Sequence, residues 1–487
     1  DTLEGPVMVL AGPGTGKTQT LAMRIANILQ QTQMDPWNIL CLTFTEAGVV
    51  AMRERLISIM GPMAYAVRIY TFHSFCNEVI QEHPDIFAQA KQWQALSDIE
   101  RVDVFRNLLN DMPIHSPLKT VFDPYQSLKD IESNIKKLKQ EDISPSDFLN
   151  ILDASEAYVT TIQRPFEQFI AKKYTDRTDA DCEAIYEKLH DAIHKLPKGM
   201  QQILEGAYVA YQEHVALAEN KRQQQSARTK FKDALKKWFD PMKKNREKLR
   251  DFLRIYEKYN KELVTFGRYD YEDMVLSVVE KFQSNDDLLA DYREQFQYIL
   301  VDEYQDTNGA QNAIVQLLCG DDDSPNIFVV GDDEQSIYRF QGASVSNMIE
   351  FYHRYERTIR VVDLKNNYRS TPQILSSAVY LIAHNKERLS NHIPGLKDDL
   401  LPTIESKIPV RVIEYTSEDM EADGVAAHIQ HLIAEGAVPS KIAVLVRYKR
   451  DGAPLYRSLS ARGVPARLEV GQDVLKSDTT RAIVQLV

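Results

Sequence analysis

The chain has 487 residues, of which 44% are hydrophobic and 26% charged, and its formal net charge is −12. This length exceeds what one compact core holds and predicts about three domains. The sequence has no apolar run near the ~18 residues of a membrane span, no basic region before its first apolar stretch, and four scattered cysteines without CxxC spacing. These features argue against a membrane protein, a signal peptide, a disulfide framework and a zinc site, and they predict a cytoplasmic protein. The negative charge leaves nucleic-acid binding open, because a local basic surface is enough for it.

The first predicted element is a short buried strand over residues 5–10, followed at once by AGPGTGKT and a helical stretch. The glycines of this loop let successive N–H groups point inward at a phosphate, and the helix N-terminus adds a partial positive charge. Lys17 would reach the β- and γ-phosphates of ATP, and Thr18 would hold Mg²⁺. The strand before the loop and the helix after it make a chance match a poor explanation, although Ala11 replaces the first glycine of the pattern. We therefore predict an ATP-binding loop made of Gly12, Pro13, Gly14, Thr15, Gly16, Lys17, Thr18 and Gln19.

Residues 77 to about 265 are rich in Lys, Glu, Gln, Asp and Leu, and helical spacing recurs in them. This pattern predicts a helical domain inserted between strands of the nucleotide-binding domain. Within it, residues 221–250 hold twelve basic and three acidic side chains, a local balance of +9. Such a segment could contact a nucleic-acid backbone, or it could be a solvated helix face without a partner. Pro241 is predicted to break the helix.

A hydrophobic strand over residues 296–301 ends in two carboxylates, Asp302 and Glu303. Ligands of open α/β sheets bind at the carboxyl ends of strands. Asp302 would complete the Mg²⁺ shell, and Glu303 would orient and polarise the attacking water. An acidic turn after a core strand is the plain alternative, but a phosphate loop needs an acidic strand somewhere in the chain. The 285 positions between Lys17 and Asp302 also require a large insertion between strands.

Two further strands are each followed by a polar segment. After the strand over residues 325–330, Gln335 sits where an uncharged side chain could sense the γ-phosphate, and Tyr338 and Phe340 could stack on bases. By spacing alone, these two aromatic residues are more typical of a core. After the strand near residue 361, Arg369 could act as an arginine finger on the transition-state charge, although a single arginine there is more often a surface residue.

Together these segments resemble the superfamily 1 helicases, specifically the group of UvrD, PcrA and Rep with their RecB and AddA relatives. The resemblance covers residues 5–375 and rests on seven blocks in the order of that family. The blocks are AGPGTGKT, ILCLTFTEAGVVAMRERL, IYTFHSFC, YDYEDMV, VDEYQDTN, GDDEQSIYRFQGA and NNYRS.

The resemblance implies roles for residues at matching positions. In the ATP site, Tyr368 would stack on adenine and Arg369 would contact the γ-phosphate. The catalytic set would be Lys17, Glu303, Gln335 and Arg369, with Thr18 and Asp302 on Mg²⁺. The single-stranded DNA path would be lined by Thr43, Phe44, Thr71, His73, Tyr338 and Phe340. The implied activity is an ATP-dependent 3′–5′ helicase or translocase that acts on single-stranded DNA and junctions in repair or recombination.

Some features depart from the family. Gln341 stands where the family usually has arginine, and no upstream segment supplies the glutamine of the adenine-recognition block. The two later blocks that complete the motor are not found before Val487, and residues 441–470 read as strand, helix and strand at the start of a second motor domain. We therefore expect a fragment of the motor.

The predicted fold is α/β, a RecA-like phosphate-loop domain with a large helical insertion, followed by part of a second RecA-like domain. Residues 1–76 and 266–348 are assigned to the first domain, 77–265 to the insertion and 349–487 to the second domain. The rival hypothesis is a helicase-like ATP switch that binds DNA or a partner without unwinding. A phosphate-loop kinase is a poorer alternative, because no kinase needs the stacking loop.

Overall fold

The computed structural model describes residues 3–468, with gaps, and the chain divides into two compact units, Asp1–Lys407 and Ile408–Val487. The gaps within the described range are residues 88–92, 121, 192, 194–195, 197, 219, 337–344, 386–387, 392, 394–395, 397–399 and 407. No helix in the described part of the chain is both long and apolar enough to cross a membrane.

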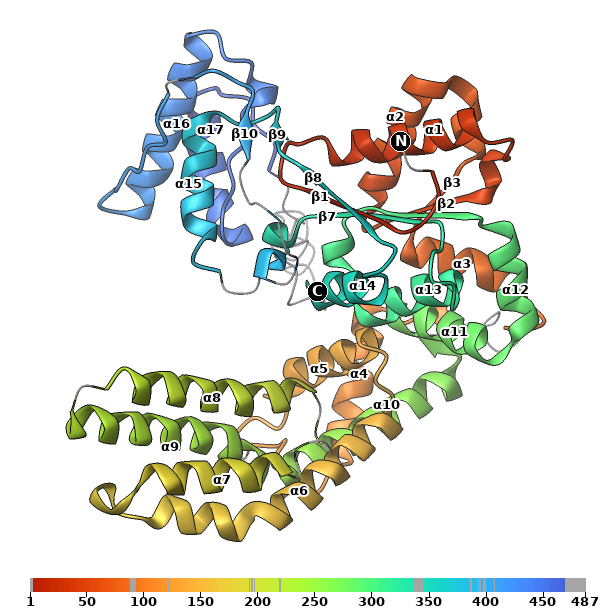
Figure 1. The fold of residues 1–487 in the computed structure, drawn as a ribbon. Coiled ribbons are helices and arrows are strands. Elements are labelled where there is room, and N and C mark those ends of the chain that lie inside the picture. Colours follow the sequence, from red (N-terminus) through yellow and green to blue (C-terminus); the bar gives the residue numbers. More distant parts are fainter. Residues whose placement is uncertain are drawn as a thin grey trace, which may run out of the picture. The chain divides into compact units, whose positions relative to one another are not determined.

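The first unit is organised around a six-stranded parallel sheet with the order β3-β2-β6-β7-β1-β8 (Figure 1). Its four inner strands, β2, β6, β7 and β1, are fully buried and mostly apolar, as expected when helices cover both faces of a parallel sheet, whereas the edge strands β3 and β8 are only partly buried. In β1, Val9 pairs with Val330 of β7 and with Val362 of β8. The strands are β1 Val7–Ala11, β2 Ile39–Thr43, β3 Arg68–Thr71, β6 Tyr298–Val301, β7 Ile327–Gly331 and β8 Arg360–Leu364.

Alternate strand residues face two separate cores. Val7 and Val9 of β1 pack under α1 and α2, whereas Met8 and Leu10 pack against the helices of the opposite face. On the first face lie α1 Lys17–Gln31 and α2 Glu46–Met60. On the second face lie α3 Phe72–Glu82, α11 Tyr271–Ser284, α12 Asp286–Gln295, α13 Gly309–Cys319 and α14 Val345–Arg354. This arrangement confirms the predicted α/β class with a helical insertion.

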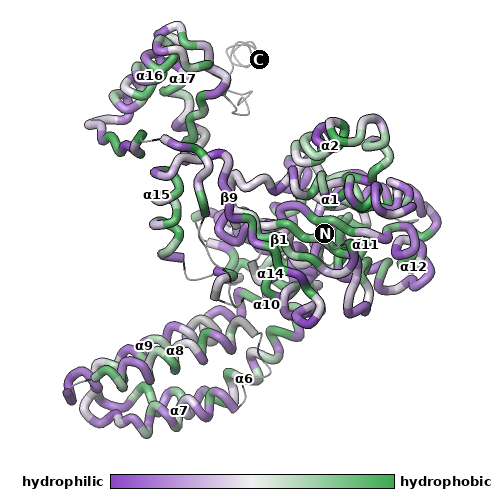
Figure 2. Tube along the Cα trace, turned by 45° about the horizontal axis from the view of Figure 1, so that its top comes forward, coloured by the Kyte–Doolittle hydropathy of each residue, from purple (hydrophilic) through white to green (hydrophobic). Residues whose placement is uncertain are grey.

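The insertion between β3 and β6 is helical, as predicted, but it has two cores. The first core is formed by α4 Asp98–Asn110, α5 Leu128–Gln140 and α10 Arg246–Phe266. The second core is formed by α6 Pro145–Ala171, α7 Asp179–Asp191, α8 Lys198–Ala216 and α9 Lys221–Lys244. Figure 2 shows hydrophilic and hydrophobic residues alternating along α8 and α9, as expected for helices with one apolar face. A short pair of strands, β4 Gln94–Ala95 and β5 Arg268–Tyr269, joins the two ends of the insertion.

The structure differs from the sequence-based expectations at Pro241 and near residue 348. Helix α9 is not broken at Pro241 but continues to Lys244, so the proline lies in its last turn. The predicted domain boundary after residue 348 falls inside the first unit. Helix α14 packs in the core on one face of the first sheet through Met348 and Phe351, and β8 joins that sheet by pairing with β1.

The remaining elements lie after β8. In the first unit they are β9 Asn366–Asn367, α15 Pro372–Ile382 and β10 Leu401–Pro402. In the second unit, α16 Glu418–Ala434 packs on α17 Gly452–Ala461. Of the strand, helix and strand predicted over residues 441–470, the described residues form the helix, α17, and no strand. The short 3-10 helices are Pro36–Asn38, Gly61–Ala66, Tyr174–Asp176, Tyr304–Asp306, Asp333–Gln335, Leu389–Asn391, Pro439–Lys441 and Lys449–Asp451.

Candidate active site

The phosphate loop connects the carboxyl end of β1 to the first turn of α1. Gly14 and Gly16 have φ values of +76° and +95°, a conformation that disfavours other residues. Gly16 is the N-cap residue of α1, and the first turn of this helix holds no acidic residue. Helix α1 keeps its apolar residues Leu21 and Ile25 on the sheet, so its N-terminus is fixed at the loop. The loop therefore offers backbone N–H groups and a helix dipole to an anion.

The acidic residues after β6 meet this loop. Lys17 Nζ lies 2.8 Å from Glu303 Oε2, which joins two segments 286 positions apart in the sequence. Glu303 has a φ of +50°, a conformation that costs a non-glycine residue about 1–3 kcal/mol and is often found at functional sites. Asp302 is buried, and its Oδ1 accepts the Glu303 N–H at 3.0 Å. Burial, and secondarily the Glu303 charge, raise the pKa of Asp302 to about 6, while Lys17 acts against this rise.

Gln305 is a site residue that sequence reasoning missed. Its side chain is 1% exposed and bridges two strand ends: Nε2 donates to Glu303 Oε2 at 2.8 Å, and Oε1 accepts the Asp332 N–H at 2.9 Å. The Asp332 carboxylate in turn accepts a hydrogen bond from the Gln335 side chain. The candidate base and the candidate phosphate sensor are therefore linked through Gln305 and Asp332. The only sequence signal was a polar residue two positions after the carboxylate pair.

We expect Gln305→Leu to lower ATP turnover about tenfold while the KM for ATP changes little, because Leu cannot hold Glu303 in place. Steady-state ATP hydrolysis at varied ATP concentration measures kcat and KM separately. Gln316→Leu, at a half-buried glutamine of α13 outside the site, serves as the matched control. A parent-like kcat in the Gln305 variant would contradict the positioning role.

The segment after β8 lies directly against the phosphate loop. The Tyr368 N–H donates to Gly14 O at 2.9 Å, and the Asn367 side chain donates to Pro13 O. Asn367 is fully buried, and its Oδ1 accepts the N–H groups of Arg369 and Ser370 at 2.9 and 2.7 Å. A Cβ on Gly14 would lie 2.6 Å from Arg369 Cβ, so glycine is required for this approach. The structure thus brings Tyr368 and Arg369, both predicted for the ATP site, to the phosphate loop. Tyr368 is 62% exposed there.

Apart from the phosphate loop, a cavity of about 550 Å³ lies where the insertion meets the first sheet. Among the predicted DNA-path residues, Phe44, Thr71 and His73 line it. Burial lowers the pKa of His73, with Glu272 acting against the shift. Tyr271, which sequence reasoning did not single out, also lines the cavity, is 56% exposed and packs edge-to-face on His73 with ring centroids 6.1 Å apart.

Two threonines of the predicted DNA path have contacts within the protein. Thr43 is 2% exposed at the end of β2. Thr71 caps α3: its Oγ1 accepts the Ser74 N–H at 3.1 Å and donates to Glu46 Oε1 at 3.0 Å. Tyr338, Phe340 and Gln341 lie outside the described residues.

Comparison with known proteins decides the family. Residues 1–356 match the UvrD/REP helicase N-terminal domain, and residues 362–479 match the UvrD-like helicase C-terminal domain. The chain belongs to the UvrD/REP helicase family. The RecA-like motor fold expected from its sequence is the fold of this family.

Curated relatives of this UvrD/REP family chain include three bacterial proteins. The ATP-dependent DNA helicase PcrA of Bacillus subtilis is 26% identical over 466 residues, which are 95% of this chain and 48% of the relative. The protein of the same name from Leuconostoc citreum is 27% identical over 468 residues, 95% of this chain and 48% of the relative. The putative ATP-dependent DNA helicase YjcD of Bacillus subtilis is 28% identical over 490 residues, 99% of this chain and 49% of the relative. The chain thus spans about half the length of these relatives.

The donors in this UvrD/REP family site suit a magnesium nucleotide. Mg²⁺ in phosphate-transfer sites is held by one or two protein oxygens, substrate phosphates and waters. A carboxylate and a hydroxyl, from Asp302 and Thr18, are therefore a sufficient protein contribution. Within the described residues, no cluster of three or more His, Cys, Asp or Glu side chains is placed to hold a metal ion.

The basic segment of the insertion is partly used inside the fold. Arg228 Nη2 lies 2.6 Å from Asp179 Oδ2, and Arg250 Nε lies 2.8 Å from Glu156 Oε1. Trp238 is buried and donates to Met200 O at 3.1 Å, so it belongs to the core of the helical bundle. Six other cations of the segment face solvent: Lys221, Arg222, Lys230, Lys236, Lys237 and Lys248.

Proposed function

We propose that this chain is the ATP-hydrolysing part of a DNA motor that moves along single-stranded DNA. The observation that carries this proposal is the 2.8 Å ion pair between Lys17 and Glu303, which assembles a phosphate loop and an acidic strand end into one site. The family match and the cavity beside His73 support DNA as the track. We assign residues 3–76 and 266–364 to the first motor domain, and the helical residues between them to its insertion.

In the proposed reaction, the Lys17 ammonium moves from Glu303 to the β- and γ-phosphates when ATP enters the loop. Mg²⁺, held by Thr18 and Asp302, would neutralise developing phosphate charge. The freed Glu303 carboxylate orients the attacking water and accepts its proton as the bond to the γ-phosphorus forms and the bond to the leaving ADP breaks. Gln335 and Arg369 would contact the γ-phosphate, and Tyr368 would stack on adenine. Most of the catalysis is positioning and charge stabilisation.

For the DNA path, we propose that Phe44, His73 and Tyr271 form the floor on which bases lie. The Tyr271 ring is exposed and is braced by His73, so it can stack on a base without rearrangement. Burial lowers the pKa of His73, so the charged form of this side chain is disfavoured in the cavity. Phosphate recognition then falls to other groups, among them the exposed Lys136 at the cavity edge.

We expect Tyr271→Ala to weaken single-stranded DNA binding by about 1–3 kcal/mol, which is about 5- to 150-fold, because one stacking face is lost. Fluorescence anisotropy with a labelled oligonucleotide measures the change. Tyr65→Ala, at a tyrosine 67% exposed in a 3-10 helix of the same domain, is the matched control. Equal affinity of the Tyr271 variant and the parent would remove Tyr271 from the path.

Strand separation on a duplex with a 3′ or a 5′ single-stranded tail tests the motor against the rival, an ATP switch that binds DNA without unwinding. We propose 3′–5′ movement and action on junctions in repair or recombination. ATP-dependent separation of the 3′-tailed duplex alone supports this proposal. DNA-stimulated hydrolysis without separation of either duplex favours the switch.

A further inference from the structure

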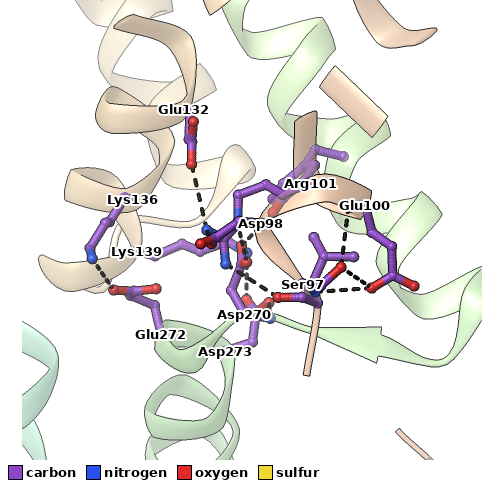
Figure 3. Close-up of polar contacts among 12 residues, drawn as sticks. Ser97, Asp98, Glu100, Arg101, Glu132, Lys136, Lys139, Asp270, Glu272 and Asp273 are labelled. Atoms are coloured by element: carbon purple, nitrogen blue, oxygen red, sulfur yellow. Dashed lines mark hydrogen bonds and ion pairs between the residues drawn. The ribbon is translucent and has the colours of Figure 1, made fainter. Parts of the chain in front are cut away.

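A buried lysine connects the insertion to the first motor domain. Lys139, in the last turn of α5, is 1% exposed, and its Nζ lies 2.6 Å from Asp273 Oδ1 and 3.3 Å from Asp270 Oδ2 (Figure 3). The ammonium also lies 4.9 Å from the centroid of the Tyr259 ring. Lys139 and Tyr259 come from the insertion, whereas both aspartates open α11, which packs on the motor core.

The two aspartates are held by further contacts around the same lysine. Asp270 caps α11, and its N–H donates to Asp273 Oδ2 at 2.9 Å. The Tyr259 hydroxyl donates to Asp270 Oδ2 at 2.6 Å, and Arg101 Nε lies 3.3 Å from Asp270 Oδ1. Figure 3 shows Arg101 from α4, Lys139 from α5, and Asp270 and Asp273 at the start of α11 converging on one place. We name Arg101, Lys139, Tyr259, Asp270 and Asp273 the ionic joint.

Lys139 is the buried cation of the ionic joint. Its ammonium contacts both Asp270 and Asp273, and its side chain is 1% exposed. The Arg101 side chain is 20% exposed and is shared between Asp270 and two acids outside the joint. These acids are Asp98, at 3.0 Å, and Glu132, at 3.6 Å. Burial raises the pKa of Asp273, and the Lys139 charge acts against that rise. Removing one partner of a buried pair leaves an uncompensated charge, whereas removing both partners is often tolerated. The ionic joint is therefore sensitive to loss of Lys139 alone.

The first turn of α11 contributes side chains both to the ionic joint and to the wall of the cavity proposed to bind DNA. Asp270 and Asp273 contact Lys139, while the residues between them, Tyr271 and Glu272, line the cavity with His73. Glu272 Oε1 lies 3.2 Å from Lys136 Nζ, one turn before Lys139 on α5. Any shift of α5 against α11 would thus move the walls of the cavity relative to one another.

We propose that Lys139 is a positioning residue that sets the first turn of α11, and with it Tyr271, at a fixed place against the insertion. The DNA consequence of this inference rests on the proposed function, whereas the geometric consequence does not. Lys139 touches neither ATP nor DNA in this account. Its loss weakens single-stranded DNA binding and leaves ATP hydrolysis without DNA unchanged.

The test uses Lys139→Met, the double variant Lys139→Met/Asp273→Asn and the control Lys137→Met, whose lysine is exposed on the same helix. We expect Lys139→Met to raise the half-saturating concentration of single-stranded DNA about tenfold, within the range for residues that act through packed networks. The double variant removes both partners of the 2.6 Å pair between Lys139 and Asp273, so it leaves no unpaired charge from that pair and is expected to bind within about threefold of the parent. Lys137→Met should bind as the parent does. A folded Lys139→Met variant with parent affinity, or a folded double variant that binds tenfold more weakly than the parent, overturns the proposal.

A distance measurement separates this inference from the proposed function. Spin labels are attached at Lys129→Cys on α5 and Glu294→Cys on α12, which are both exposed positions. The distance between the two labels, measured in the absence of DNA, reports whether the ionic joint holds α5 in place. We expect one narrow distance distribution in the parent, a broader one in Lys139→Met and a narrow one again in the double variant. If Lys139→Met does not fold, both measurements are made on the double variant alone. Its affinity for single-stranded DNA and its distance distribution must then match those of the parent. If the distance distribution of folded Lys139→Met is the same as that of the parent, the positioning role of Lys139 is overturned. If the three proteins show the expected distributions but the parent binds no DNA, only the proposed function is overturned.

Discussion

Glu303→Gln is expected to lower steady-state ATP turnover by about 10²- to 10⁴-fold, the usual contribution of a general base, while ATP affinity changes only a few fold. The amide keeps an oxygen that can accept the hydrogen bonds from Lys17 and Gln305, so the site should stay assembled. It cannot accept the proton of the attacking water, and turnover is lost for that reason alone. Hydrolysis of ATP at saturating concentration, beside a nucleotide-binding titration, measures both quantities.

Glu54→Gln is the matched control for this substitution, because Glu54 is an exposed acid on α2 of the same domain. We expect parent turnover in that variant. If Glu303→Gln also hydrolyses ATP at the parent rate, Glu303 is not the base. If instead it loses ATP binding, the ion pair with Lys17 is a structural requirement of the loop.

Lys17→Ala is expected to lower kcat/KM for ATP by about 10³-fold or more, because it removes a preorganised cation from the transition-state charge. Lys17 is the only cation within ion-pair distance of Glu303 in the described part of the chain. Its loss also leaves Glu303 without that partner, so ATP binding and turnover should both fall. Initial rates over a range of ATP concentrations give the ratio.

Lys261→Ala, at an exposed position of α10 in the insertion, controls for the loss of a surface charge. It should leave kcat/KM unchanged. A Lys17→Ala variant whose kcat/KM stays within threefold of the parent would contradict the assignment of the phosphate loop.

The parts of the site that sequence reasoning could predict are those with local patterns. The phosphate loop is a run of glycines between a strand and a helix, and its conformation follows from neighbours within about ten residues. The carboxylates after β6 follow an apolar strand in the same way. The ion pair between Lys17 and Glu303 could then be expected, because parallel strands bring their carboxyl ends to one edge of a sheet.

The parts that could not be predicted depend on pairing between distant segments. Strand β8 is a short strand with two charged residues, Arg360 and Asp363, and nothing in its sequence says that it joins β1 rather than a second sheet. Asn367 and Gln305 are polar residues whose roles come from the loops they meet, at Pro13 and Asp332. The split of the insertion into two cores is also hidden, because helices of both cores share the same 3.6-residue period.

We propose that this chain couples ATP hydrolysis at the phosphate loop to the binding of single-stranded DNA, and steady-state hydrolysis by the 487-residue chain with and without an oligonucleotide tests this most directly. We predict turnover that single-stranded DNA raises at least severalfold, that saturates with oligonucleotide concentration and that disappears in Glu303→Gln. Turnover that is indifferent to DNA in the parent, or that survives in Glu303→Gln, would contradict the claim.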